Sequence, residues 1–176
     1  MLGEETFHPD TKALLSYGRA LAGVGAPPKR GGANQVLERL FVIERAKDGR
    51  LPIRTFGAEL VPLFGADLRE HDFRRFFLAP DLGMLNALIN ACEAASEPGI
   101  ARVIAETGDR RALGAEILLT PLRVDQHLGQ RFLCMFQSLG GHAFISERPI
   151  LRLKIGSLHP PASKAPIGLR LAVVND

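Results

Sequence analysis

The chain of 176 residues is 46% hydrophobic and 23% charged, the ordinary range for one globular domain with a short extension. It holds no apolar run long enough to cross a bilayer, and its acidic start is unlike a signal peptide. The net charge of +3 comes from residues 140–176, where scattered charges and one aromatic residue do not make the face of a nucleic-acid binder. We therefore expect a cytoplasmic protein that binds neither membrane nor nucleic acid.

The N-terminal region predicts one helix and a linker. Asp10 is a suitable N-cap for a helix over residues 11–22. Its expected apolar face consists of Leu14, Tyr17 and Leu21. Paired prolines and glycines between residues 26 and 34 predict a flexible connection that separates this helix from the rest of the chain.

The next region predicts a hairpin that leads into a short helix. Residues 36–44 and 51–56 are expected to be strands, joined by a turn at residues 47–50. Gly57 permits a sharp turn, the helix begins near Glu59 or Leu60, and Gly65 ends it. Between residues 67 and 77 the pattern predicts short helical turns whose aromatic rings point inward.

The remaining elements are one long helix and a series of strands. Pro80 marks the start of a helix whose apolar stripe continues to Ala95. Period-two patterns predict strands over residues 100–107, 112–122 and 131–139, and possible further strands over residues 150–155 and 169–174. The strands near residues 40–43 and 131–139 are apolar on both sides, so we expect them at the centre of the sheet, with the N-terminal helix covering the second face.

Residues 57–68, GAELVPLFGADL, carry a resemblance to a known family. They are similar to the G-x-x-L-x-x-L-F-G-x-D-L run at which PAS domains leave their second strand, and the predicted order of elements is also that of a PAS domain. The resemblance covers about residues 10–139. It is closest to the small single-domain PAS-like proteins common in alphaproteobacteria, in which a helix and a proline-containing linker precede one domain.

The resemblance implies an α+β fold, with a five-stranded antiparallel sheet and helices on one face. The expected organisation is an N-terminal helix and linker (residues 1–34), a PAS-like domain (35–139) and a C-terminal extension (140–176) with one or two extra strands. It also implies sensing, homodimerisation and signal relay rather than catalysis. Because no output domain is attached, a separate signalling protein is the expected partner.

Ten apolar residues form the candidate site between the helices and the sheet. They either line a ligand cavity or fill a core, since both need the same residue types. The ten are Leu63, Phe64, Phe76, Phe77, Leu85, Ile89, Ile117, Leu119, Cys134 and Phe136. The two functional hypotheses follow from this choice: a regulator that acts only through protein contacts, or a sensor whose bound small molecule switches the partner interface.

Polar candidates lie just after the motif, at Arg69, His71 and Asp72. His71 lies where some PAS domains place a haem ligand or pocket residue, and Arg69 to Asp72 spells the R-x-x-D of some cyclic di-GMP sites; solvated surface is the simpler interpretation of both. The five histidines are too scattered for metal ligands. Cys92 and Cys134 lie in apolar surroundings that fit buried, reduced thiols, so we expect no enzyme, no metal and no evident cofactor.

Overall fold

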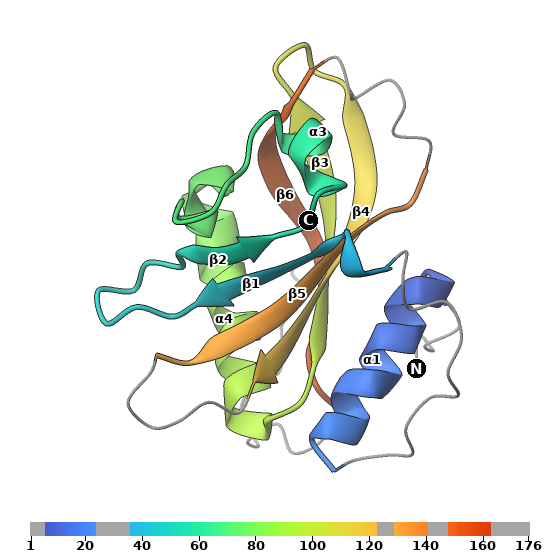
Figure 1. The fold of residues 1–176 in the computed structure, drawn as a ribbon, viewed down its shortest axis with the longest axis vertical. Helices are drawn as coiled ribbons and strands as arrows, with labels where there is room; N and C mark the ends of the chain where they lie inside the picture. Colours follow the sequence, from blue (N-terminus) through green and yellow to red (C-terminus); the bar gives the residue numbers. More distant parts are fainter. Residues whose placement is uncertain (1–5, 24–35, 123–128, 141–147, 163–176) are drawn as a thin grey trace, which may run out of the picture.

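The computed structural model describes residues 6–23, 36–122, 129–140 and 148–162, and within them the chain forms a six-stranded sheet with helices on both faces (Figure 1). In chain order the elements are α1 (Pro9–Leu21), β1 (Leu40–Glu44), β2 (Ile53–Phe56), α3 (Leu60–Phe64), the 3-10 helix η2 (Phe73–Phe76), α4 (Ala79–Ala95), β3 (Gly99–Thr107), β4 (Ala112–Leu122), β5 (Arg131–Ser138) and β6 (Ile150–His159). The α+β class is confirmed. The linker at residues 26–34 and the possible strand at residues 169–174 lie outside the described residues.

The strands are antiparallel and follow the order β2-β1-β5-β4-β3-β6. The sheet has one strand more than the expected five, because β6 pairs with β3 along its length. This strand corresponds to the possible strand predicted at residues 150–155, and it continues to His159. The central pair is β5 and β4, so the predicted central position is confirmed for β5, whereas β1 is second from the edge.

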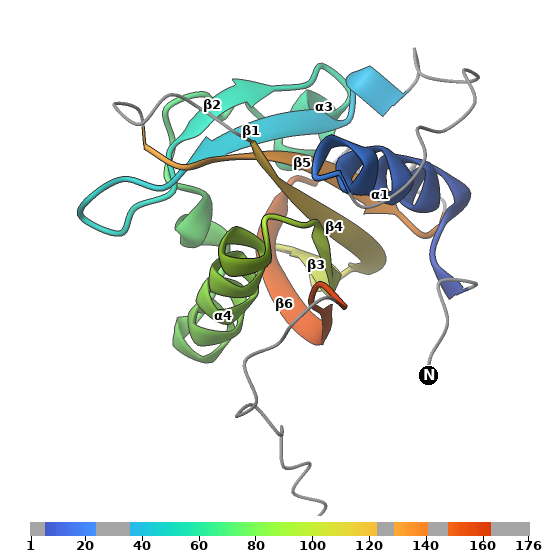
Figure 2. The same cartoon turned by 90° about the horizontal axis from the view of Figure 1, so that it is seen from below.

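The two faces of the sheet have separate cores. On one face α3, η2 and α4 pack in a large cluster that includes side chains from every strand. On the other face Leu15 of α1 packs with Ile100, Leu118 and Met135. Figure 2 shows α1 and α4 on opposite sides of the sheet. The expectation that the N-terminal helix covers the second face is thus confirmed, and it explains why β5 is apolar on both sides.

The start of α1 differs from the prediction. The helix begins at Pro9, and the N-cap is His8, whose Nδ1 accepts a hydrogen bond from the Asp10 amide at 3.2 Å. Proline suits the first helical position because it lacks the amide hydrogen that would have no partner there. Asp10 lies inside the first turn, where its carboxylate accepts a hydrogen bond from Arg39 at 2.9 Å.

The buried face of α1 also differs from the prediction. The helix turns Thr11, Leu15 and Gly18 toward the sheet, while Tyr17 and Leu21 are 45% and 50% exposed. A Cβ at Gly18 would lie 2.9 Å from the Thr120 hydroxyl oxygen, so the glycine permits close approach of the helix to β4. Because a helix that packs this tightly must bury small residues, the larger apolar stripe is left facing outward.

Candidate functional site

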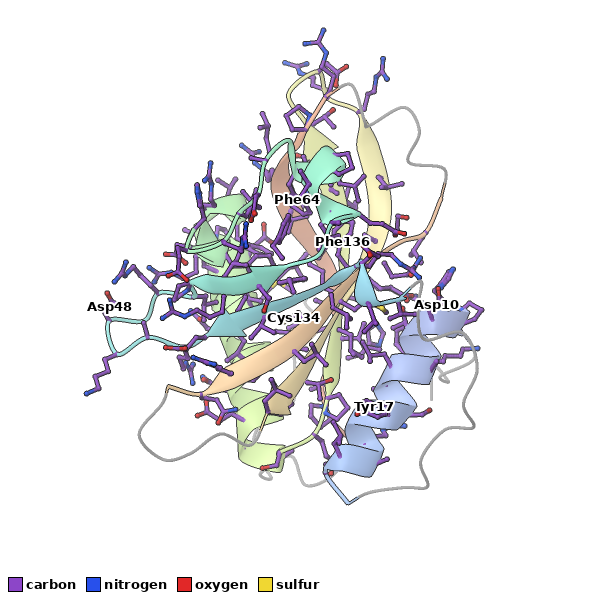
Figure 3. The ribbon with its side chains drawn as sticks, in the orientation of Figure 1. Asp10, Tyr17, Asp48, Phe64, Cys134 and Phe136 are labelled. Atoms are coloured by element: carbon purple, nitrogen blue, oxygen red, sulfur yellow. The ribbon has the colours of Figure 1, made fainter. Side chains whose placement is uncertain are left out.

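The ten apolar candidates lie together in the larger core, and every one is buried. They come from α3 (Leu63, Phe64), η2 and the residue after it (Phe76, Phe77), α4 (Leu85, Ile89), β4 (Ile117, Leu119) and β5 (Cys134, Phe136). The structure therefore brings the whole predicted set into one contiguous region between the helices and the sheet. Figure 3 labels three of the ten, Phe64, Cys134 and Phe136.

Phe64 is at the centre of an aromatic network in this region. Its ring centroid is 5.0 Å from that of Phe76, 5.5 Å from that of Phe136 and 5.7 Å from that of Phe56. Edge-to-face pairs at these separations are in direct contact, so no flat ligand fits between the paired rings. Seven of the ten phenylalanines join this chain of contacts, since Phe73 links Phe76 and Phe77 to Phe41 and so to Phe56.

Two glycines of the GAELVPLFGADL stretch place α3 over the core. A Cβ at Gly57 would lie 2.2 Å from the Glu38 carbonyl oxygen, so this position requires glycine for close backbone contact rather than for an unusual turn. Gly65 ends α3 in the left-handed conformation, with φ of 73°, and a Cβ there would lie 2.8 Å from Pro149. The predicted helix start is confirmed, with Glu59 as N-cap.

The two cysteines are buried free thiols within the core. Burial raises the pKa of the Cys92 thiol to about 12 and raises the pKa of the Cys134 thiol well above its ordinary value. Both thiols are therefore protonated at neutral pH and are poor nucleophiles. Their chemical role is that of small apolar side chains.

The three polar candidates lie at the surface side of the turn after α3. Arg69 and His71 are exposed; the Arg69 guanidinium pairs with Asp67, and His71 contacts the Arg75 guanidinium at 2.7 Å. The Asp72 carboxylate accepts hydrogen bonds from the Leu51 amide at 3.0 Å and the Arg74 amide at 3.1 Å, and so caps η2. Burial alone would raise the pKa of Asp72, but these bonds and the Arg74 guanidinium outweigh it and lower the pKa.

A polar anchor that the sequence patterns did not predict lies on the face of the sheet covered by α1. Glu116 of β4 is fully buried there and accepts hydrogen bonds from the His8 amide at 3.1 Å and the Arg102 guanidinium at 3.4 Å. Arg102 also donates to the Thr6 carbonyl oxygen at 2.6 Å and covers the Phe7 ring. Arg102 and Glu116 are directly opposite each other on β3 and β4. Glu116 is the one charged residue of β4, which was the available signal.

A second missed feature joins three strands at the hairpin end of the sheet. Glu44 of β1 accepts hydrogen bonds from Arg54 of β2 at 3.2 Å and Arg131 of β5 at 2.8 Å. The Arg54 hydrogen bond is the main cause that lowers the pKa of Glu44, and Arg131 adds to it. This cluster joins the ends of the three strands and keeps the Glu44 carboxylate paired.

Other classes of site find no support in the part of the chain that is described. Its His, Cys, Asp and Glu side chains form no group of three that could hold a metal ion. No helix among the same residues is long and apolar enough to cross a membrane.

Comparisons with known proteins found one family model and several solved structures. The PAS domain model of a protein family matches residues 6–137. A LOV protein of Rhodobacter sphaeroides is similar in structure at 12% identity, with 64% of this chain and 68% of that chain covered and a TM-score of 0.47. The light state of the Aureochrome1 LOV domain is similar at 12% identity, with coverages of 64% and 88% and a TM-score of 0.44. No curated protein matches the sequence, and no enzyme family is indicated. Since the family match spans well over half of the chain, the protein belongs to the PAS domain family.

Proposed function

We propose that this PAS-domain protein is a cytoplasmic regulator that acts in signal transduction through contact with a separate signalling protein. The observation that carries the proposal is the packing of the Phe64 ring against Phe56, Phe76 and Phe136. Where a sensor of small molecules would need open space, these rings touch each other. A domain whose interior is occupied by its own side chains has its outer surface left for function.

We also propose that the protein is a homodimer joined through α1. Leu14, Tyr17 and Leu21 follow one side of this helix at spacings of three and four residues. Leu14 is half-buried, whereas Tyr17 and Leu21 are about half exposed. The same stripe on a second copy gives each helix an apolar partner and a self-complementary, two-fold interface.

The ligand question is tested on protein purified from its native cell. We expect an absorbance scan without a visible band and a native mass equal to a whole number of unmodified chains. A visible band or a stoichiometric extra mass that disappears on denaturation would instead favour the sensor hypothesis, whether the molecule is haem, a cyclic dinucleotide or another small ligand.

The dimer is tested by sedimentation equilibrium at micromolar concentration. The expected mass is that of two chains, and Tyr17→Glu with Leu21→Glu should reduce it to one chain while the far-UV circular dichroism stays unchanged. The matched control is Leu78→Glu, which changes another half-exposed leucine that lies outside α1. A wild-type mass equal to one chain would exclude this dimer.

A further inference from the structure

Part of the sheet face that carries α1 is exposed to solvent. A row of residues crosses three strands of this exposed part: Lys154 of β6 is opposite Ile104 of β3, which is opposite Gly114 of β4. Leu139, the residue after β5, extends the row, since its amide donates to the Gly114 carbonyl oxygen at 2.8 Å. Ile104 is four residues from Ile100 on the same strand and face, but only Ile100 is covered with Leu15. Ile104 and Leu139 are 41% and 46% exposed.

Gly114 makes a shallow notch in this open row. It is an exposed glycine in the interior of a strand, where a residue with a side chain would pair better with its neighbours. A Cβ there would meet only Leu139, at 3.9 Å, so space does not require the glycine. The notch lies between Ile104 and Leu139 and can receive an apolar side chain from outside.

Basic side chains border the apolar row along β6. Lys154 is exposed and makes no ion pair within the described part of the chain. Arg152 has a partner in Glu106, but the atoms are 4.0 Å apart and both side chains are well exposed, so the pair contributes little. The border therefore keeps a net positive charge next to apolar surface.

A hollow of about 490 Å³ continues this surface at the turn between β3 and β4. Two basic residues, Arg110 and Arg152, and one acidic residue, Glu106, line it together with Leu151, which is 59% exposed. Arg110 has φ of 65°, a conformation that favours glycine, so the turn retains an arginine at a position where glycine would be less strained. The Arg110 side chain has no ion pair with any described residue.

We propose that this basic-apolar surface, formed by Ile104, Gly114, Leu139, Arg152, Lys154 and Arg110, binds an acidic segment of the signalling partner that also carries apolar side chains. The inference rests on the proposed function and names the chemistry of the partner. Charge complementarity selects this occupant, since carboxylates match the basic border and an apolar residue fills the notch. A second copy of the surface would bring like charges together. A nucleic acid backbone would match the basic border but would offer no apolar side chain to cover Ile104 and Leu139.

The test attaches a benzophenone crosslinker at single exposed positions of the full chain. Leu139→Cys is labelled with benzophenone maleimide, which the buried, protonated Cys92 and Cys134 do not take up. Leu78→Cys, with a leucine that is equally exposed elsewhere, is the positional control. After irradiation in native extract, mass spectrometry identifies the crosslinked peptide.

The expected product joins position 139 to a protein segment rich in Asp and Glu, and position 78 does not give it. Arg152→Glu with Lys154→Glu should lower the yield at least tenfold, and the corresponding glutamine pair should lower it less. The control pair Lys47→Glu and Arg50→Glu reverses two exposed charges at the hairpin and should leave the yield unchanged. Equal melting temperatures show that the variants fold.

Four results would overturn the proposed binding surface. Two concern the partner segment: its crosslinking yield is unchanged by the charge reversal on β6, or it contains no excess of Asp and Glu. The other two concern a different target: the crosslink forms to a second copy or to nucleic acid, or it forms within the same chain. Formaldehyde fixation of the unlabelled chain in its native cell separates this failure from that of the proposed function. If fixation recovers a partner protein in amounts that the charge reversal does not change, only the location of the binding surface is wrong. If fixation recovers no partner, the proposed function fails.

Discussion

Replacing Phe64 by alanine distinguishes a filled core from the wall of an open cavity. The Phe64 side chain is 8% exposed and contacts three other rings. If the ring is packed on all sides, its removal loses the transfer free energy of the ring and leaves a cavity, at a cost of about 3–5 kcal/mol. In a chain of this length that corresponds to a fall in Tm of roughly 6–20 °C.

The assay is equilibrium unfolding in urea followed by circular dichroism, because the chain has no tryptophan and one tyrosine. Leu78→Ala is the control, since this leucine is half exposed and its removal should change the unfolding free energy by less than about 0.5 kcal/mol. A loss below about 1 kcal/mol for Phe64→Ala would refute the packed-core argument, because it would mean that the ring already faces empty space.

Three further predictions concern the backbone, the thiols and pH. Gly57→Ala should be strongly destabilising, because the new Cβ would lie 2.2 Å from a carbonyl oxygen. Gly83→Ala within α4 is the control: its Cβ would have no neighbour within 4 Å, so the change should stabilise the protein by about 0.5–1 kcal/mol. Thermal unfolding measures both variants, and equal changes in Tm would contradict the steric clash at Gly57. Cys92 and Cys134 should resist a thiol reagent at pH 8 in the folded protein and both react in urea; a fast-reacting native thiol would show that one is accessible. The pKa of Glu44 is lowered in the folded state, so its contribution to stability is present above its ordinary pKa of 4.5 and is lost as the pH falls through the folded-state pKa. Glu44→Gln should therefore flatten the pH dependence of the free energy of urea unfolding in that range. An unchanged pH dependence would show that Glu44 is not its source.

The N-terminal helix illustrates what a single sequence can and cannot predict about packing. Its existence followed from periodicity, but its buried face did not, because hydrophobicity selects Leu14, Tyr17 and Leu21 whereas the closest contact with the sheet uses Gly18. Which face packs depends on the shape of β4, and that shape is set by residues about a hundred positions away. The start of the helix was missed because Pro9 already occupies the first turn.

The candidate site also has a part that the sequence could predict and a part that it could not. The apolar residues around Phe64 could be collected from the sequence because strands and helices of known period each turn one apolar side inward. The Arg102–Glu116 anchor could not, because it requires the register of β3 against β4 and the path of Thr6 and Phe7 across them. Local patterns contain neither.

The pairing of β6 with β3 has a consequence for how the protein can be divided. The family match ends at residue 137, yet Ile150 and Leu153 of β6 are completely buried in the main core. Pro149, just before this strand, lies so close to the end of α3 that a Cβ on Gly65 would be 2.8 Å from it. A fragment that ends where the family similarity stops would expose apolar surface and the unpaired edge of β3. Because an unpaired strand edge can pair with another chain, such a fragment should aggregate. The boundary of inherited similarity and the boundary of cooperative folding therefore fall at different places in this chain.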